Sequence, residues 1–180
     1  MKVKIKYIDD KAKQLYLKAS DGKYDRPYKT YDDDFCYDVI ATSCKEVAPN
    51  VYKYGLGIAF QIVRDGYKAL VGKMDYVGYG FDDNFDTKLQ SLHLSIDVRP
   101  RSSVWKTGMV LSNCEGTIDE LYTGEVSAVF YHVMPTMPKY EVGDRIGQIK
   151  IGATIPIEFI ESDELSKTER GTGGYGHTGK

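Results

Sequence analysis

One segment of the chain brings a carboxylate and an aromatic ring close together between two glycines. The stretch CEGTIDELYTGE places Asp119 and Tyr122 three residues apart, between Gly116 and Gly124. The glycines predict a β-hairpin here. A carboxylate at such a position could activate a water molecule as a general base, provided that it lies within hydrogen-bond reach. The alternative is a turn aspartate that caps its own backbone.

Two further segments carry groups that bind phosphate. RPRSSVWKTG supplies Arg101, Ser102 and Ser103 directly after a predicted strand, where a guanidinium, two hydroxyls and loop amides could clamp a phosphate. EVGDRIGQIKI joins a Gly-Asp turn to a strand, with Arg145 and Gln148 near the start of that strand. Taken alone, each segment is also typical of a solvated surface turn.

The C-terminal segment from Ser162 to Lys180 loses the apolar periodicity of the preceding chain. It ends in RGTGGYGHTGK, with five glycines among eleven residues, and cannot order itself through a core. Arg170 could pair with phosphate oxygens while glycine amides cradle them, and Tyr175 could stack on a base. A tail that orders over its ligand forms a lid that excludes water. The alternative is a floppy terminus.

The elements that must position these groups are predicted to be strands. KVKIKYI alternates apolar and polar residues, and YGLGIAFQIV, SLHLSIDV, SAVFYHV and QIKIGATIPIEFI are rich in β-forming residues. In the middle of the chain, residues 118–122 form the one passable helical window, and the surrounding glycines favour a hairpin there. We therefore predict an all-β fold, closed as one compact barrel or sandwich.

Length and charge limit the function classes. A chain of 180 residues fits one domain. The 24 Lys and Arg residues against 26 Asp and Glu residues give a formal net charge of -2, which excludes a general attraction to nucleic acid or anionic membranes. No apolar run approaches a membrane span, and the N-terminus does not predict an export signal. An anionic ligand must therefore be held by local groups.

The three cysteines, Cys36, Cys44 and Cys114, are odd in number and lack C-x-x-C spacing. This argues against a disulfide framework and against a thiolate zinc site. We expect free, mostly buried thiols in a reducing cytosol.

Taken in order, five segments resemble the five motifs of the trimeric deoxyuridine triphosphatase (dUTPase) family. They are FCYDVIA with Asp38, followed by YGLGIAFQI; PRSSVWKTG; GTIDELYTGEV, preceded by Asn113; GDRIGQIKI; and RGTGGYGHTGK. The resemblance is specific because all five occur in the right order. It leaves the first thirty or so residues and the segment from Arg64 to Gln90 outside the pattern.

The resemblance implies a distorted jelly-roll β-barrel of the β-clip type with a flexible, glycine-rich C-terminal arm. The barrel would span residues 1–165, with an insertion at about 64–90. Residues 166–180 would form the arm. The family assembles as a homotrimer with active sites at subunit interfaces, and the arm closes over a neighbour's site. The implied location is the cytosol of a bacterium or of a phage-infected host.

The implied activity is the Mg²⁺-dependent hydrolysis of dUTP to dUMP and pyrophosphate by water attack on the α-phosphorus. This reaction keeps uracil out of DNA and supplies dUMP for thymidylate synthesis. Carried over by position, Asp119 would deprotonate the water and Gln148 would help to position it. Tyr122 would pack beneath the deoxyribose and exclude a 2′-hydroxyl. Mg²⁺ would bridge the triphosphate mostly through water, with Asp38 as an outer-shell partner.

The remaining implied contacts divide between base and phosphates. The segment from Asn113 to about Ser127 would form the uracil pocket, whose backbone rejects thymine and cytosine. The tail would cover the uracil and close on the β- and γ-phosphates. The substrate-binding residues implied in this way are Arg101, Ser102, Ser103, Asn113, Thr117, Ile118, Tyr122, Ser127, Arg170, Tyr175, Gly176, His177 and Thr178.

Two departures and two rival functions accompany this interpretation. Cys36 stands where the family has glycine, and Tyr175 stands where it has phenylalanine, whose stacking a tyrosine ring retains. The 64–90 segment could be inert, an extra trimer contact or a surface for another protein. One rival is therefore a nucleotide-binding regulatory protein on a dUTPase scaffold. The other, a dCTP deaminase, would need a glutamate in a differently written third motif.

Overall fold

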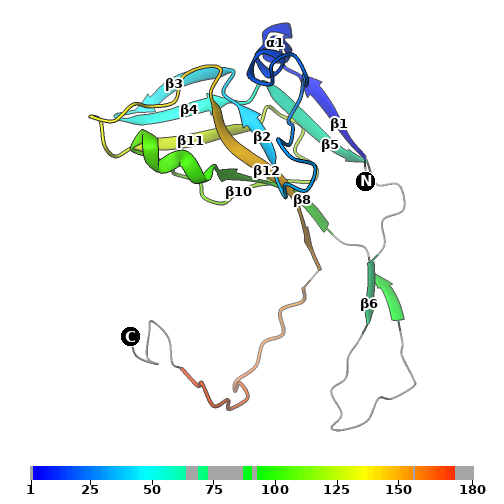
Figure 1. Ribbon diagram of the computed structural model, residues 1–180. Coiled ribbons are helices and arrows are strands. Elements are labelled where there is room, and N and C mark those ends of the chain that lie inside the picture. The colour runs from blue at the N-terminus through cyan, green and yellow to red at the C-terminus, as the bar shows by residue number, and fades with distance from the viewer. Residues whose placement is uncertain (1, 64–68, 73–86, 91–92, 156, 173–180) are drawn as a thin grey trace.

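The computed structural model describes residues 2–63, 69–72, 87–90, 93–155 and 157–172 (Figure 1). Two four-stranded sheets dominate the fold, one in the order β10-β8-β12-β2 and the other in the order β3-β4-β11-β9. The elements are β1 (Lys2–Tyr7), α1 (Asp10–Ala19), β2 (Tyr37–Ile40), β3 (Ser43–Ala48), β4 (Val51–Gly55), β5 (Ile58–Val63), β6 (Ala69–Gly72), β7 (Thr87–Gln90), β8 (His93–Pro100), a 3₁₀ helix (Ser102–Thr107), β9 (Met109–Leu111), β10 (Gly116–Asp119), β11 (Ser127–His132) and β12 (Arg145–Thr154).

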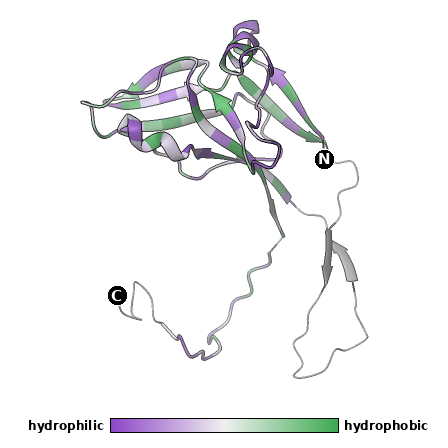
Figure 2. Cartoon of the chain, in the orientation of Figure 1, coloured by the Kyte–Doolittle hydropathy of each residue, from purple (hydrophilic) through white to green (hydrophobic). Residues whose placement is uncertain are grey.

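The core lies between these two sheets. Ile96 and Val98 of β8 pack with Ile149 of β12 in one apolar cluster that also contains residues of the second sheet. Figure 2 shows hydrophobic and hydrophilic residues alternating along the strands, as expected for sheets with one buried face. The jelly-roll-like β fold is confirmed, but the sheets do not close into a barrel. In the described chain each sheet keeps two edges, so the architecture is a sandwich.

The predicted strand YGLGIAFQIV is interrupted by a bend at a glycine, where the chain passes from one sheet to another. The segment is two strands, β4 and β5, with a break at residues 56–57. Gly57 has a φ of +65°, and an added Cβ there would lie 2.5 Å from the Cβ of Ala12. Only glycine fits this position, because the backbone conformation and the close approach both exclude a side chain.

The N-terminal segment contains an α-helix that the all-β prediction missed. Asp9 caps α1 by accepting a hydrogen bond from the backbone N–H of Ala12 at 2.8 Å. Ala12 and Tyr16, four residues apart, are both buried. The preceding strand, predicted from KVKIKYI, is confirmed as β1, which pairs antiparallel with β5. In the described part of the chain no helix has the length and apolar character needed to cross a membrane.

The predicted hairpin around Asp119 is wrong in its pairing. β10 pairs antiparallel with β8, with Asp119 opposite Ser95, whereas β11 pairs with β4 and β9 in the other sheet. The chain turns directly after β10, where the backbone N–H of Tyr122 donates to the carbonyl of Asp119 at 3.0 Å. Asp119 therefore stands at the end of an edge strand.

The strand predicted from QIKIGATIPIEFI is shorter than expected. β12 ends at Thr154, and the following described residues have neither helix nor strand. Ile157, Phe159 and Ile160 are 74%, 90% and 81% exposed. The apolar part of the predicted strand thus leaves the sandwich, and its described residues are exposed in the single chain.

The 64–90 segment contains a pair of strands. β6 and β7 pair antiparallel, from Ala69 opposite Gln90 to Gly72 opposite Thr87, and form a two-stranded sheet of their own. The sequence predicted an insertion here, and this strand pair is the described part of it. The residues between the two strands lie outside the described part of the chain.

The cysteines are free, as predicted, but they are not mostly buried. Cys44 and Cys114 are exposed, and Cys36 is half-buried. The expectation of buried thiols was wrong because Cys44 lies on β3, an edge strand whose residues are all exposed.

Candidate functional site

A polar pocket of about 370 Å³ opens beside β2. Three of the residues predicted to form the site, Asp38, Arg101 and Gln148, meet there. The full lining is Thr30, Tyr31, Asp34, Cys36, Asp38, Arg101, Arg145 and Gln148. Ser102 and Ser103 follow Arg101 in the 3₁₀ helix, beside the pocket rather than in its lining.

Asp38 is the centre of this pocket and is only 4% exposed. Its Oδ1 accepts hydrogen bonds from Arg101 Nε at 3.2 Å and from Gln148 Nε2 at 3.3 Å. Its Oδ2 accepts from Arg145 Nη1 at 3.3 Å. A buried carboxylate is stable when it is paired and hydrogen-bonded in this way. Each guanidinium has five N–H donors, so both keep donors for a ligand.

Two features of the backbone bring the arginines to Asp38. Arg101 is the N-cap residue of the 3₁₀ helix, in extended conformation, directly after β8 ends. Arg145 begins β12, where the pairing register with β2 shifts between Arg145 and Gly147. In a regular strand, residues three apart point to opposite faces. The shift lets Arg145 and Gln148 reach the same carboxylate.

Arg145 was missed as a site residue because the sequence interpretation placed it in a solvated surface turn. The structure corrects this, since its side chain contacts a buried carboxylate and lines the pocket. In a regular strand, a residue three positions before Gln148 points to the other face, so the spacing alone did not predict that Arg145 belongs to the site. Thr30, Tyr31 and Asp34 were missed because they lie outside the recognised motifs.

The other predicted residues gather around β10. Asp119 and Thr117 are exposed, whereas the Ile118 side chain packs against the core, so that only its backbone could face a ligand. The Tyr122 hydroxyl donates to the carbonyl of Glu125 at 3.0 Å. An added Cβ at Gly124 would lie 2.5 Å from that hydroxyl, so the glycine makes room for the ring.

Asn113 and Ser127 bound this second group. The Asn113 Oδ1 accepts a hydrogen bond from the backbone N–H of Val129 at 3.4 Å, which joins the segment before β10 to β11. An added Cβ at Gly116 would lie 3.0 Å from the Asn113 Nδ2, so the backbone passes close to the amide. Ser127 is half-buried at the start of β11.

The two groups are far apart within one chain. Asp119 lies opposite Ser95 of β8, and Gln148 lies opposite Arg99 of the same strand. Four residues of strand correspond to about 13 Å. This exceeds the reach of a carboxylate and an amide that share one water molecule.

An ion pair occupies the face of the sheet between the two groups. Lys150 Nζ lies 2.9 Å from Asp97 Oδ2, and the Ser95 hydroxyl donates to Asp97 Oδ1 at 2.9 Å. Burial raises the pKa of the Asp97 carboxyl, but the hydrogen bonds from Lys150 and Ser95 outweigh it, so its pKa lies below the ordinary value. An added Cβ at Gly152 would lie 2.6 Å from Asp97 Oδ2.

A magnesium ion held by the protein alone does not fit the described residues, which contain no group of three or more His, Cys, Asp or Glu side chains able to hold a metal. The Asp38 carboxylate has about four acceptor positions and uses three of them. The remaining position suits a water molecule. A magnesium ion that arrives on a polyphosphate and keeps its waters therefore fits.

The tail residues are only partly described. Arg170 is exposed, in a stretch without helix or strand. Tyr175, Gly176, His177 and Thr178 lie outside the described residues, so their expected contacts stay predictions.

Comparison with known proteins assigns the chain to a family. Residues 84–179 match the model of the dUTPase family. The deoxyuridine 5′-triphosphate nucleotidohydrolase of Nautilia profundicola is 35% identical over 120 residues, which cover 66% of this chain and 77% of that protein. The chain belongs to the dUTPase family. The enzyme of the same name from Fusobacterium nucleatum is 42% identical over 86 residues, which cover 47% of this chain and only 59% of that protein.

Solved structures of dUTPases share the fold. A mutant dUTPase of Staphylococcus bacteriophage 80alpha, with dUpNHpp, has a TM-score of 0.67 at 17% sequence identity and covers 99% of both chains. The dUTPase of phage phi11 of S. aureus, which carries a species-specific insert, has a TM-score of 0.58 at 13% identity. It covers 93% of this chain and 100% of that one. These structures show the shared fold, and the sequence matches confirm the predicted membership of the dUTPase family.

Proposed function

We propose that this protein hydrolyses dUTP to dUMP and pyrophosphate by attack of water on the α-phosphorus. The observation that carries the proposal is the pocket in which Asp38 holds Arg101, Arg145 and Gln148, in a chain of the dUTPase family. Relatives in that family are named deoxyuridine 5′-triphosphate nucleotidohydrolases. In the cytosol, the reaction would keep uracil out of DNA and supply dUMP for thymidylate synthesis.

The pocket would bind the phosphates. Arg101 and Arg145 are already oriented by Asp38, so little reorganisation is needed when a phosphate arrives. Oriented guanidiniums stabilise the negative charge that shifts to the leaving pyrophosphate as the bond to the α-phosphorus breaks. Ser102 and Ser103 would add hydroxyl donors at the edge of the pocket.

The segment around β10 would bind the nucleoside and supply the base. Asp119 is exposed and free of the core, as a group that must take a proton from water needs to be. The hydrogen bond of Tyr122 to Glu125 fixes its ring, which would pack beneath the deoxyribose and leave no space for a 2′-hydroxyl. Asn113, Ser127 and the backbone of residues 117–119 would read the uracil.

The separation of these two groups supports a homotrimer with sites shared between chains. About 13 Å of strand separates Asp119 from Gln148 within one chain. A neighbouring chain would bring its own Asp119 to the pocket. The exposed Ile157, Phe159 and Ile160 suit burial against a neighbour, from which residues 166–180 would continue as the arm. Arg170, Tyr175, Gly176, His177 and Thr178 would then close the site.

Mg²⁺ would accompany the substrate. The dUTPase of phage phi11 of S. aureus coordinates a structural Mg(II) ion, although that structure shares only 13% identity with this chain. When bound to the triphosphate, the ion neutralises phosphate charge and draws electrons towards the leaving group. The residue nearest to that role is Asp38, which would hold one of the ion's waters.

The decisive measurement is pyrophosphate release from dUTP, UTP, dTTP and dCTP, each with Mg²⁺ and with EDTA. We expect release from dUTP alone and only with Mg²⁺. Ammonia release from dCTP would instead identify a deaminase. A protein that leaves dUTP intact in the presence of Mg²⁺ would disprove the proposed activity.

A second candidate role concerns the 64–90 segment, which would bind a partner protein. The observation that favours it is that β6 and β7 form a sheet separate from the sandwich strands. Deleting residues 64–90 should then remove partner binding and spare hydrolysis. Loss of hydrolysis would show that the segment is structural.

A further inference from the structure

The charges that line the pocket cancel. Arg101 and Arg145 contribute two positive charges, and Asp34 and Asp38 contribute two negative charges. The negative charge of Asp38 is already paired with the two guanidiniums. Asp34 is the second carboxylate, and it faces a cavity that, under the proposed function, receives a triphosphate. A carboxylate in such a place repels a triphosphate that has no bound cation.

The position of Asp34 is fixed by its own turn. Its Oδ2 accepts a hydrogen bond from the backbone N–H of Tyr31 at 3.0 Å. Its backbone N–H donates to the Tyr31 carbonyl at 3.1 Å. The half-buried side chain therefore cannot leave the pocket wall without losing a hydrogen bond and opening the turn.

The loop that carries Asp34 is closed at its base. The backbone N–H of Asp38 donates to the Tyr28 carbonyl at 2.7 Å, and the Tyr28 N–H donates back at 3.4 Å. The Tyr28 ring is 7% exposed, and its hydroxyl donates to the carbonyl of Ala19 at the end of α1. The pocket wall is therefore attached to the N-terminal helix.

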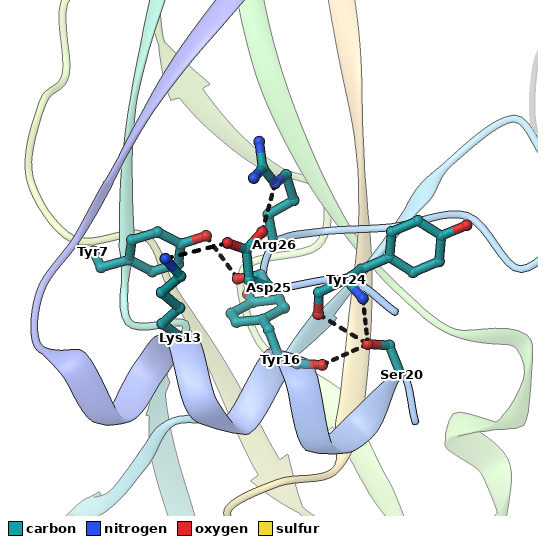
Figure 3. Close-up of polar contacts among 7 residues, drawn as sticks. All are labelled: Tyr7, Lys13, Tyr16, Ser20, Tyr24, Asp25 and Arg26. Carbon is teal, nitrogen blue, oxygen red and sulfur yellow. Dashed lines mark hydrogen bonds and ion pairs between the residues drawn. The ribbon is translucent and has the colours of Figure 1, made fainter. Parts of the chain in front are cut away.

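A second set of contacts ties down the chain before Tyr28 (Figure 3). The Tyr7 hydroxyl donates to the Asp25 carbonyl at 2.6 Å, and Lys13 Nζ lies 3.4 Å from the Asp25 carboxylate. The hydrogen bond from Arg26 lowers the pKa of Asp25, so this carboxylate stays ionised and keeps its contacts. All of these residues precede the region that matches the family model.

We propose that Asp34 is a specificity-determining residue that makes the pocket select the triphosphate bound to a divalent cation over the free triphosphate. The free triphosphate has two more negative charges than its complex with the cation, so Asp34 repels it more strongly. Towards the complex, the Asp34 carboxylate would accept hydrogen bonds from the ion's water shell, while Arg101 and Arg145 would bind the phosphates. This inference rests on the proposed function.

The test measures binding of non-hydrolysable dUpNHpp by isothermal titration calorimetry, with Mg²⁺ and with EDTA. In Asp34→Asn, affinity in EDTA should rise and affinity in Mg²⁺ should fall. Each change should be about three- to tenfold, the size expected for one unit charge about 4 Å away in a pocket filled with water. Asparagine retains the Oδ acceptor of the turn, so the loop should keep its shape. Melting temperatures of both proteins check this.

The matched control is Asp33→Asn, which removes the same charge one residue away, at an exposed position outside the lining. It should leave both affinities unchanged. Equal effects of the two variants would show that the affinities respond only to the overall surface charge, and this would overturn the proposal. Equal weakening of both affinities in Asp34→Asn would assign the residue to loop packing and overturn it too.

Failure of the proposed function can be distinguished from failure of this inference. If wild type hydrolyses dUTP but its preference for the Mg²⁺ complex is unaltered in Asp34→Asn, only the inference is lost. If wild type does not act on dUTP, inorganic tripolyphosphate replaces dUpNHpp in the same titration. An unchanged Mg²⁺ preference for tripolyphosphate, or no binding of it at all, then overturns the inference.

Discussion

At the scale of single residues, the pocket depends on Asp38 as an organiser. A carboxylate that is 4% exposed contacts two guanidiniums and one amide at distances of 3.2–3.3 Å. Such a group is stable only while its partners remain, and removing one partner of a buried pair is costly. We therefore assign Asp38 the structural task of aiming Arg101 and Arg145, in addition to its proposed contact with a magnesium-bound water.

Asp119 has no comparable structural task, and this makes its replacement informative. We expect Asp119→Asn to bind dUpNHpp as wild type does and to lower turnover of dUTP by about 10²- to 10⁴-fold, because the variant cannot accept a proton from water. Calorimetry and single-turnover pyrophosphate release measure the two effects. Asp21→Asn, an exposed change in the turn after α1, is the control. Wild-type turnover in Asp119→Asn would remove the role assigned to this residue.

At the scale of elements, β8 and β12 do two tasks at once. Their inward residues, such as Ile96 and Ile149, build the core. Their outward residues hold the Asp97–Lys150 pair between the phosphate pocket and the end of β10. The pair joins the two strands between the candidate site residues at either end.

The Asp97–Lys150 pair should make stability depend on pH. The pKa of Asp97 is lowered in the folded state, so its contribution is present above the unfolded value of about 4 and is lost as the pH falls through the folded value. We expect Asp97→Asn to cost about 2 kcal/mol at pH 7, as for a hydrogen bond to a charged group. The difference from wild type should shrink below pH 4.

Urea unfolding from pH 7 to pH 3 measures that difference. Asp163→Asn, in the exposed stretch after β12, should show a small difference that does not vary in the same way. A constant gap between wild type and Asp97→Asn across the whole range would show that the pair contributes no pH-dependent stability.

At the scale of the whole molecule, the single chain is incomplete as a catalyst in the proposed mechanism. Its phosphate pocket and its base stand about 13 Å apart along β8. Its apolar segment after β12 is exposed, with Phe159 at 90%. Both features are explained if, in the proposed trimer, a neighbouring chain brings its Asp119 to the pocket and covers the exposed apolar segment.

Mixing two inactive variants tests the shared site. We expect Arg101→Ala and Asp119→Asn to be inactive as separate proteins and to recover about a quarter of the wild-type turnover after co-refolding in equal amounts. A trimer has three sites, and over all randomly assembled trimers one site in four on average would combine an intact Arg101 from one chain with an intact Asp119 from another. Native mass spectrometry checks that mixed trimers form, because Arg101→Ala lowers the mass of its chain. If the mixed assemblies remain inactive, both residues act within one chain.

Much of the fold was predictable because its signals are local. Alternation in KVKIKYI predicted β1, the β-forming residues of SLHLSIDV predicted β8, and the Gly-Asp pair of EVGDRIGQIKI predicted the turn before β12. Helix α1 was missed although its Asp9 cap and the spacing of Ala12 and Tyr16 are visible in the sequence. The segment is short, and its helical character depends on burying Tyr16 against strands that come later in the chain.

The sequence by itself determined the family and the β-rich class, and it predicted Asp38, Arg101, Gln148 and Asp119 as site residues, because spacing within a motif is a local property of the chain. Tertiary structure alone decided which of them meet. Pairing of β10 with β8 rather than β11, the register shift that turns Arg145 towards Asp38, and the loop that places Asp34 in the same pocket join residues distant in sequence. Non-local packing sets such contacts, and no local pattern encodes them.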